Sequence, residues 1–256
     1  MPGESVMQLG YFGKTIHRGD FVRFNLPKSF FTVMDDWLQG AMETGETTFG
    51  GDWPERFHNA AGFRFQLSVN IAGENGWFGI ITPSSDKVGR RFPFCLAASL
   101  AEGFIPPWGQ PAFEEGLRNL EAFSAKVNNP DYTFDSVQED LAVLAADLSH
   151  LMNQSATRSV AGSNENDEEP FLLAATGREV LQSTTGCLAI LDSVLKHNYF
   201  SYSVWQPIAA SDTDKTLITS GLPPKRLAVS LFDGDWSEET PNLLQLAAST
   251  LAAPSQ

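Results

Sequence analysis

Segments that favour β-strands lie on both sides of a block of helices, and this order restricts the folds that the chain can adopt. Residues 63–69 alternate apolar and polar side chains, which is the period of a half-buried strand. Residues 77–81 predict a second strand, joined to the first through a Glu74-Asn75-Gly76 turn, so the two are expected to form an antiparallel hairpin. A third strand is expected over residues 92–98, which leaves residues 83–91 as a loop between neighbouring strands.

Helices are predicted where apolar residues recur every three or four positions. The segments are 27–43, 111–127, 134–152 and 187–196, with an irregular connector at 45–59. After the helical block, strands are expected at 171–175 and 200–205, and a short apolar element at 227–232. Because strands both precede and follow the helices, we expect a single α/β domain built on a mixed, partly antiparallel sheet, and not two independent domains.

The expected domain covers residues 1–236. Within it, residues 153–170 are polar, small and acidic, so they predict a flexible, solvated loop. Residues 237–256 are weakly patterned and are expected to form a C-terminal tail.

The charge balance restricts the classes of partner. The 256 residues include 17 Lys and Arg against 31 Asp and Glu, which gives a net charge of −14. A protein that binds duplex nucleic acid needs a basic surface, and anionic lipid headgroups repel an acidic one, so neither partner is expected. A basic surface on another protein is the natural counterpart.

The chain is expected to be soluble and cytoplasmic. Its first residues lack the basic and apolar regions of a signal peptide, and no stretch approaches the roughly 20 apolar residues of a membrane helix. Cys95 and Cys187 both lie in apolar runs, which indicates buried free thiols in a reducing compartment.

Two segments, residues 10–23 and 82–94, concentrate glycines, opposite charges and aromatic rings. The candidate binding residues in them are Lys14, Arg18, Asp20, Ser84, Asp86 and Arg90. Two interpretations remain open. In the architectural one, the glycines supply turns, Asp20 hydrogen-bonds its own loop, and Asp86 pairs with Arg90. In the other, the charged side chains converge into one recognition surface, because loops on a rigid sheet often carry function.

No complete catalytic or metal-binding motif is present, and no metal or cofactor is expected. Gly13-Lys14-Thr15 resembles the end of a phosphate-binding loop, but Gln8 stands where the first glycine should be. The four histidines are far apart, and neither cysteine has a metal-ligand spacing. Ser84 lacks a nucleophile-elbow motif, although a distant histidine could complete a triad in space. The alternative function is therefore small-molecule or phospho-group binding, or weak hydrolysis, with Lys14, Arg18 and Arg90 facing an anion.

An ordered set of motifs resembles the TagF (also called ImpM) family of bacterial type VI secretion systems. The motifs are Gly10-Tyr11-Phe12-Gly13-Lys14, Arg18-Gly19-Asp20-Phe21, Leu26-Pro27, Asp36-Trp37-Leu38, Trp53, Arg64-Phe65, Trp77-Phe78-Gly79, the run from Pro83 to Pro93, Trp205 and Gly221-Leu222-Pro223. The resemblance spans about residues 9–236. Two departures are Thr15-Ile16-His17, where the family more often has a proline-containing stretch, and Phe94, where leucine is usual.

The resemblance implies a three-layer α/β/α sandwich and a cytoplasmic accessory protein without enzymatic activity. It also implies post-translational repression of the assembly of the secretion apparatus, through binding of a forkhead-associated scaffold protein of the system. Some relatives are fused to a phosphatase, but this chain has no room for that domain and no run of metal-binding aspartates. The oligomeric state and the surface that meets the partner are left open by the sequence.

Overall fold

A seven-stranded sheet forms the centre of the fold in the computed structural model, which describes residues 7–100, 111–154, 184–208 and 216–233. The strands are β1 (Leu9–Gly13), β2 (Val22–Phe24), β3 (Phe63–Leu67), β4 (Trp77–Thr82), β5 (Phe94–Ser99), β6 (Tyr202–Pro207) and β7 (Leu217–Ser220). Their spatial order is β2-β1-β5-β4-β3-β6-β7, and each pair of neighbours is antiparallel. The α/β class is confirmed, and the predicted β3–β4 hairpin forms. The described strands contain no parallel pair, so the sheet is antiparallel where a mixed one was expected.

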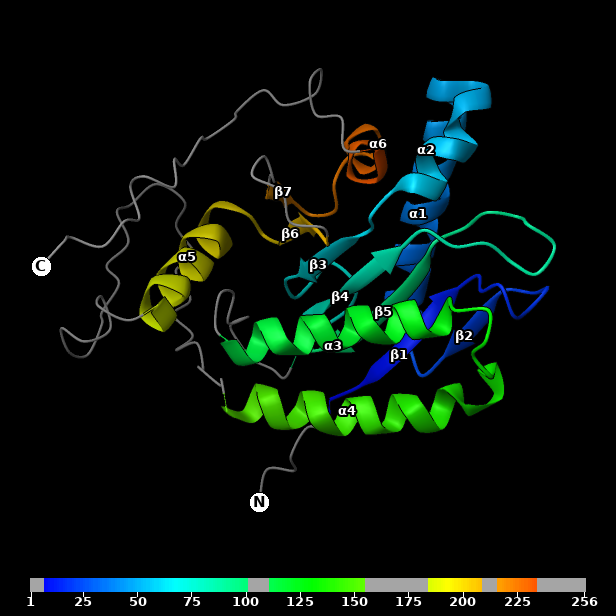
Figure 1. Cartoon of the computed structure of the whole chain (residues 1–256). Coiled ribbons are helices and arrows are strands. Elements are labelled where there is room, and N and C mark those ends of the chain that lie inside the picture. The colour runs from blue at the N-terminus through cyan, green and yellow to red at the C-terminus, as the bar shows by residue number, and fades with distance from the viewer. Residues whose placement is uncertain (1–6, 101–110, 155–183, 209–215, 234–256) are drawn as a thin grey trace, which may run out of the picture.

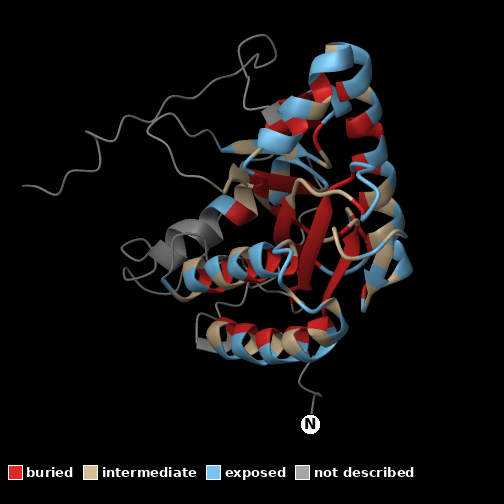
Figure 2. Ribbon diagram, turned by 45° about the vertical axis from the view of Figure 1, so that its right-hand side comes forward, coloured by how far each residue is buried: buried red, intermediate tan, exposed pale blue. Residues whose placement is uncertain are grey.

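Helices cover both faces of the sheet, which gives three layers (Figure 1). On one face lie α1 (Lys28–Phe49), α2 (Trp53–Asn59) and α6 (Lys225–Asp233). The opposite face is covered by α3 (Pro111–Val127) and α4 (Val137–Gln154), which pack against each other. A further helix, α5 (Thr184–Asn198), precedes β6. Figure 2 shows the buried strands enclosed between the two helical layers.

Strand periodicity sorts the central side chains between the two layers. Phe63, Phe65 and Leu67 of β3 belong to the core under α1 and α6. Between them, Arg64 points to the other face and pairs with Glu114 and Glu121 of α3. Alternation along a strand places successive side chains on opposite faces, so β3 gives apolar side chains to one core and a polar one to the contact with α3.

The predicted irregular connector at 45–59 is wrong. Helix α1 continues to Phe49, a 3-10 turn follows at Gly50–Asp52, and α2 begins at Trp53. Gly45 lies in the interior of α1, where glycine is unfavourable. A Cβ at this position would overlap the Trp53 ring, so the tertiary contact explains the glycine and overrides its low helix propensity.

Other predicted segments are confirmed with small changes at their ends, and α3 spans the predicted residues 111–127. The short strands β1, β2 and β7 were not predicted. The expected strand at 171–175, most of the loop 153–170, whose first two residues end α4, and the tail 237–256 lie outside the described residues.

The topology brings the two glycine- and charge-rich segments together. Gly13 at the end of β1 pairs with Phe94 at the start of β5, and Phe94 also pairs with Thr82 at the end of β4. The β1–β2 loop (residues 14–21) and the β4–β5 loop (residues 83–93) therefore leave the sheet at the same end (Figure 1). Gly13 has φ +128°, and a Cβ there would overlap the Pro93 carbonyl oxygen, so only glycine allows this approach.

Candidate functional site

Asp86 lies at the centre of the β4–β5 loop, with a fully buried side chain. Its Oδ2 contacts Arg90 Nε at 2.6 Å and Lys14 Nζ at 3.2 Å. Its Oδ1 accepts the backbone N–H groups of Arg90 at 2.9 Å and Val88 at 3.1 Å. The Asp86 carboxylate thus binds two cationic side chains and two backbone N–H groups, and three of these four groups belong to its own loop.

These contacts determine the charge state of Asp86. Burial favours the neutral carboxyl, but the hydrogen bonds from Arg90, Lys14 and Val88 outweigh burial and hold the pKa of Asp86 well below its usual range. Asp86 is therefore ionised at physiological pH.

Further bonds tie the β4–β5 loop to the β1–β2 loop. Arg90 Nη2 donates to the Gly19 carbonyl oxygen at 2.5 Å, and the Lys87 N–H donates to the Arg18 carbonyl oxygen at 2.9 Å. With the Lys14–Asp86 pair, these contacts fix two segments about seventy residues apart in the sequence as one unit. We call this unit, residues 14–21 with 83–93, the loop platform.

The other three candidate residues, Arg18, Ser84 and Asp20, belong to the platform but are not among the partners of Asp86. Arg18 pairs with Asp135 and lies over the Phe134 ring at 5.3 Å, so it is tied to the segment between α3 and α4. Ser84 Oγ donates to Asn128 Oδ1 at 2.9 Å. The Asp20 side chain is exposed and makes no ion pair or hydrogen bond within the part of the chain that the structure describes.

The contacts of Asp86, Arg90 and Asp20 bear on the architectural interpretation of these loops. Asp86 and Arg90 form the local pair that the architectural one expected, but Asp20 does not bond its own loop. The alternative of an anion site gains weight if Lys14, Arg18 and Arg90 line one open cleft. Arg90 lines the pocket described below, Lys14 and Arg18 do not, and each of the three cations holds a carboxylate of the chain, Asp86 or Asp135.

Several residues of this region were missed from the sequence. His17 Nε2 lies 2.9 Å from the Val127 carbonyl oxygen, and its ring stacks on Phe134 at 6.0 Å. Asn128 and Asp135 hold Ser84 and Arg18. All of these partners come from the end of α3 and the segment after it, and no local pattern marks them. Only the packing of α3 and α4 on the sheet brings them here.

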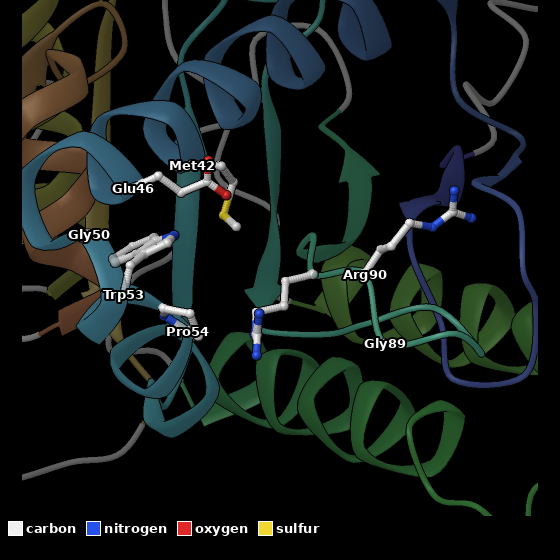
Figure 3. A pocket seen from close by; sticks show the side chains of 8 residues that line it. Met42, Glu46, Gly50, Trp53, Pro54, Gly89 and Arg90 are labelled. Carbon is white, nitrogen blue, oxygen red and sulfur yellow. The ribbon is translucent and has the colours of Figure 1, made fainter.

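A pocket of about 670 Å³ opens between the platform and the helices on its other side (Figure 3). It is lined by Met42, Glu46, Gly50, Trp53, Pro54, Gly89, Arg90 and Arg91. The side chain of Arg90 extends away from Trp53 and Pro54, toward the β1–β2 loop. Sequence reasoning did not identify this pocket, because its two walls are far apart in the chain.

Metal-ligand clusters and membrane-spanning helices are both absent from the described residues. Among the described residues, no group of three or more His, Cys, Asp or Glu side chains is placed to hold a metal ion. None of the described helices is both long and apolar enough to cross a membrane. Cys95 is buried, as expected, and burial raises the pKa of its thiol.

Comparison with known proteins agrees with the fold. A crystal structure of PA0076 from Pseudomonas aeruginosa PAO1 matches with a TM-score of 0.70, covering 93% of this chain and 100% of that chain at 20% sequence identity. At this identity the likeness establishes the fold. No match was found among curated proteins.

The sequence itself carries the assignment to a family. The profile of the TagF N-terminal domain, described as type VI secretion system-associated, matches residues 10–144, more than half of the chain. The match includes both loops of the platform, the β3–β4 hairpin and helices α1 to α3. This chain therefore belongs to the TagF family of type VI secretion system-associated proteins.

Proposed function

We propose that this protein is a non-enzymatic, cytoplasmic repressor that acts after translation and limits type VI secretion by binding a forkhead-associated scaffold protein of the apparatus. Stoichiometric binding would lower the amount of scaffold that is free to start assembly. Membership of a type VI secretion-associated family supports the connection with the apparatus.

The observation that carries the binding mode is the loop platform. Its charged groups are used to brace two loops, and it presents exposed side chains on a fixed base, among them Arg18, Asp20, Lys87 and Val88. A surface that is already ordered loses little conformational entropy on binding, which favours a protein partner. The net charge of −14 of the whole chain favours a partner with a basic surface, and on the platform itself Asp20 is the exposed acidic group that such a partner would meet.

A combined experiment tests the proposal. Purified protein is used to capture the forkhead-associated scaffold, and secretion is measured in cells that lack or overproduce this protein. We expect a complex with the scaffold, increased secretion in the deletion strain and decreased secretion on overproduction. Unchanged secretion in both strains, with no complex, would contradict the proposal.

A further inference from the structure

The pocket beside the platform has features that bracing of the loops does not explain. Its volume of about 670 Å³ falls within the range of small-molecule sites. One wall comes from the end of α1 and the start of α2, and the other from the tip of the β4–β5 loop. Met42, Trp53 and Pro54 supply an apolar surface, and Glu46 and Arg91 supply opposite charges.

Trp53 contributes a buried donor without an acceptor. Its side chain is 1% exposed, and its ring is fixed by stacking on Phe49 at 6.1 Å and by Phe57 at 5.9 Å. Its Nε1 has no hydrogen-bond partner among the described residues. In Figure 3 the indole nitrogen lies on the edge of the ring that faces Met42 and Glu46. The N–H group is buried behind these two side chains, both of which are unbranched, so a ligand would reach it through a change of rotamer at Met42 or Glu46.

Arg90 and Arg91 are neighbours in the chain but differ in their partners. The segment at Arg91 is extended and forms a bridge with Ser85, so successive side chains point to opposite sides. Both arginines line the pocket, but the Arg90 side chain is bonded to Asp86 and Gly19. Arg91 and Glu46 are both exposed, and neither forms an ion pair within the described residues.

We propose that this pocket binds a small zwitterion of the amino-acid class. Arg91 and the Trp53 N–H hold the carboxylate, Glu46 holds the ammonium group, and the apolar body lies against Met42 and Pro54. A guanidinium and an N–H group together match the two oxygens of a carboxylate. The pocket adjoins the proposed scaffold-binding surface, because Gly89, Arg90 and Arg91 belong to the loop platform.

The charges of the pocket select a zwitterion over simpler ligands. A phosphate or a dicarboxylate would place a second negative charge beside Glu46, and a simple amine would leave Arg91 and the Trp53 donor without a partner. A ligand that carries both charges satisfies all three groups, and the burial of its apolar part adds affinity.

The test uses three probes of similar shape: L-phenylalanine, 3-phenylpropionate, which lacks the ammonium group, and phenethylamine, which lacks the carboxylate. Binding to the purified full chain is followed through the indole N–H resonances of the six tryptophans, with Trp53→Phe to assign the relevant one. We expect L-phenylalanine to shift the Trp53 resonance downfield and to bind at least tenfold more tightly than the other two probes.

Variants assign the roles of the charges. Arg91→Gln should weaken L-phenylalanine at least tenfold, and Glu46→Gln should remove its advantage over 3-phenylpropionate. The matched control is Arg118→Gln on α3, which changes an exposed arginine outside the pocket. Both pocket residues are exposed, so the variants should unfold at the wild-type temperature.

Two results would overturn the assignment. One is an unchanged Trp53 resonance with L-phenylalanine near its solubility limit. The other is binding that is equal for the three probes or unaffected by Arg91→Gln. The assay needs no scaffold and no secretion, so its failure and the failure of the proposed repressor function are distinguishable.

Discussion

Asp86 and Arg90 bond to each other through both main chain and side chain. The Asp86 N–H donates to the Arg90 carbonyl oxygen at 3.0 Å, and the Asp86 carboxylate accepts the N–H of Arg90 at 2.9 Å and its Nε–H at 2.6 Å. These bonds within the loop fix its conformation without a partner. The hydrogen bond from Arg90 to the Gly19 carbonyl oxygen also fixes the position of the β1–β2 loop.

Substitution of Asp86 should loosen both loops. In Asp86→Asn the two cations lose their anion, and the amide cannot accept as many bonds. We expect a lower melting temperature and faster hydrogen exchange at Lys87, Gly89 and Arg90. The control Asp135→Asn removes an exposed partner of Arg18, and such surface pairs contribute about 0–1 kcal/mol. Equal melting temperatures for the two variants would contradict the central role of Asp86.

The contribution of Asp86 should depend on pH. Its folded-state pKa is depressed, so the stabilisation is present above the unfolded-state value of about 3.9 and is lost as the pH falls below it toward the folded-state value. We therefore expect the stability difference between wild type and Asp86→Asn to be constant from pH 7 to 5 and to shrink below about pH 4. Urea unfolding of both proteins at several pH values measures it. A difference that grows on acidification would refute the assignment.

Gly13→Ala should be strongly destabilising. The backbone at φ +128° is unfavourable for alanine by about 1–3 kcal/mol, and the added Cβ would overlap the Pro93 carbonyl. Gly19→Ala is the control, because no atom lies within 4 Å of a Cβ there. Chemical denaturation should show a large loss for Gly13→Ala and little change for Gly19→Ala.

Two buried tryptophans provide a matched pair. Trp37 Nε1 donates to the Pro223 carbonyl oxygen at 2.8 Å, whereas Trp77 Nε1 has no partner among the described residues. Replacement by phenylalanine reduces ring size in both, but only Trp37→Phe leaves a buried carbonyl without its donor, which costs about 1–3 kcal/mol. We expect Trp37→Phe to lose more stability by roughly that amount. Equal losses on denaturation would show that the bond contributes little.

Val88 should affect binding of the scaffold and leave the fold intact. Val88 lies at the tip of the platform and is 70% exposed, and Val143 on α4 is 65% exposed. Val88→Lys removes an apolar contact and places an unpaired charge in the interface, so capture of the scaffold should fall at least tenfold. Val143→Lys should bind as the wild type does. If both variants bind normally, the platform is not the docking surface.

The sequence predicts the elements whose pattern is local. Helix α3 has an uninterrupted apolar stripe, and β3 alternates regularly, so both are found. Strand β1 is interrupted by glycines, and β2 has only three residues, so neither shows the period on which prediction depends. These short strands exist because neighbouring strands supply their hydrogen bonds.

The same limit applies to the site. The Asp86–Arg90 pair was predicted because it lies within four residues of the chain. Asp135 and Asn128 reach the platform from the layer of α3 and α4, and Trp53 and Arg91 line one pocket from segments far apart in the chain. Tertiary packing creates these pairs, and local sequence carries no signal for them.

The position of β3 makes the two halves of the chain dependent on each other. Its partner on one side, β4, follows after a short turn, but its partner on the other side, β6, is more than 130 residues further along the chain. Trp205 of β6 also covers Phe63 and Phe65. A fragment that ends with α4 lacks β6, so the backbone amides along one edge of β3 would have no partner strand. The apolar rings of Phe63 and Phe65 beside that edge would also be more exposed, and such an edge favours self-association. We therefore expect a fragment limited to residues 10–144, the stretch that matches the family, to self-associate.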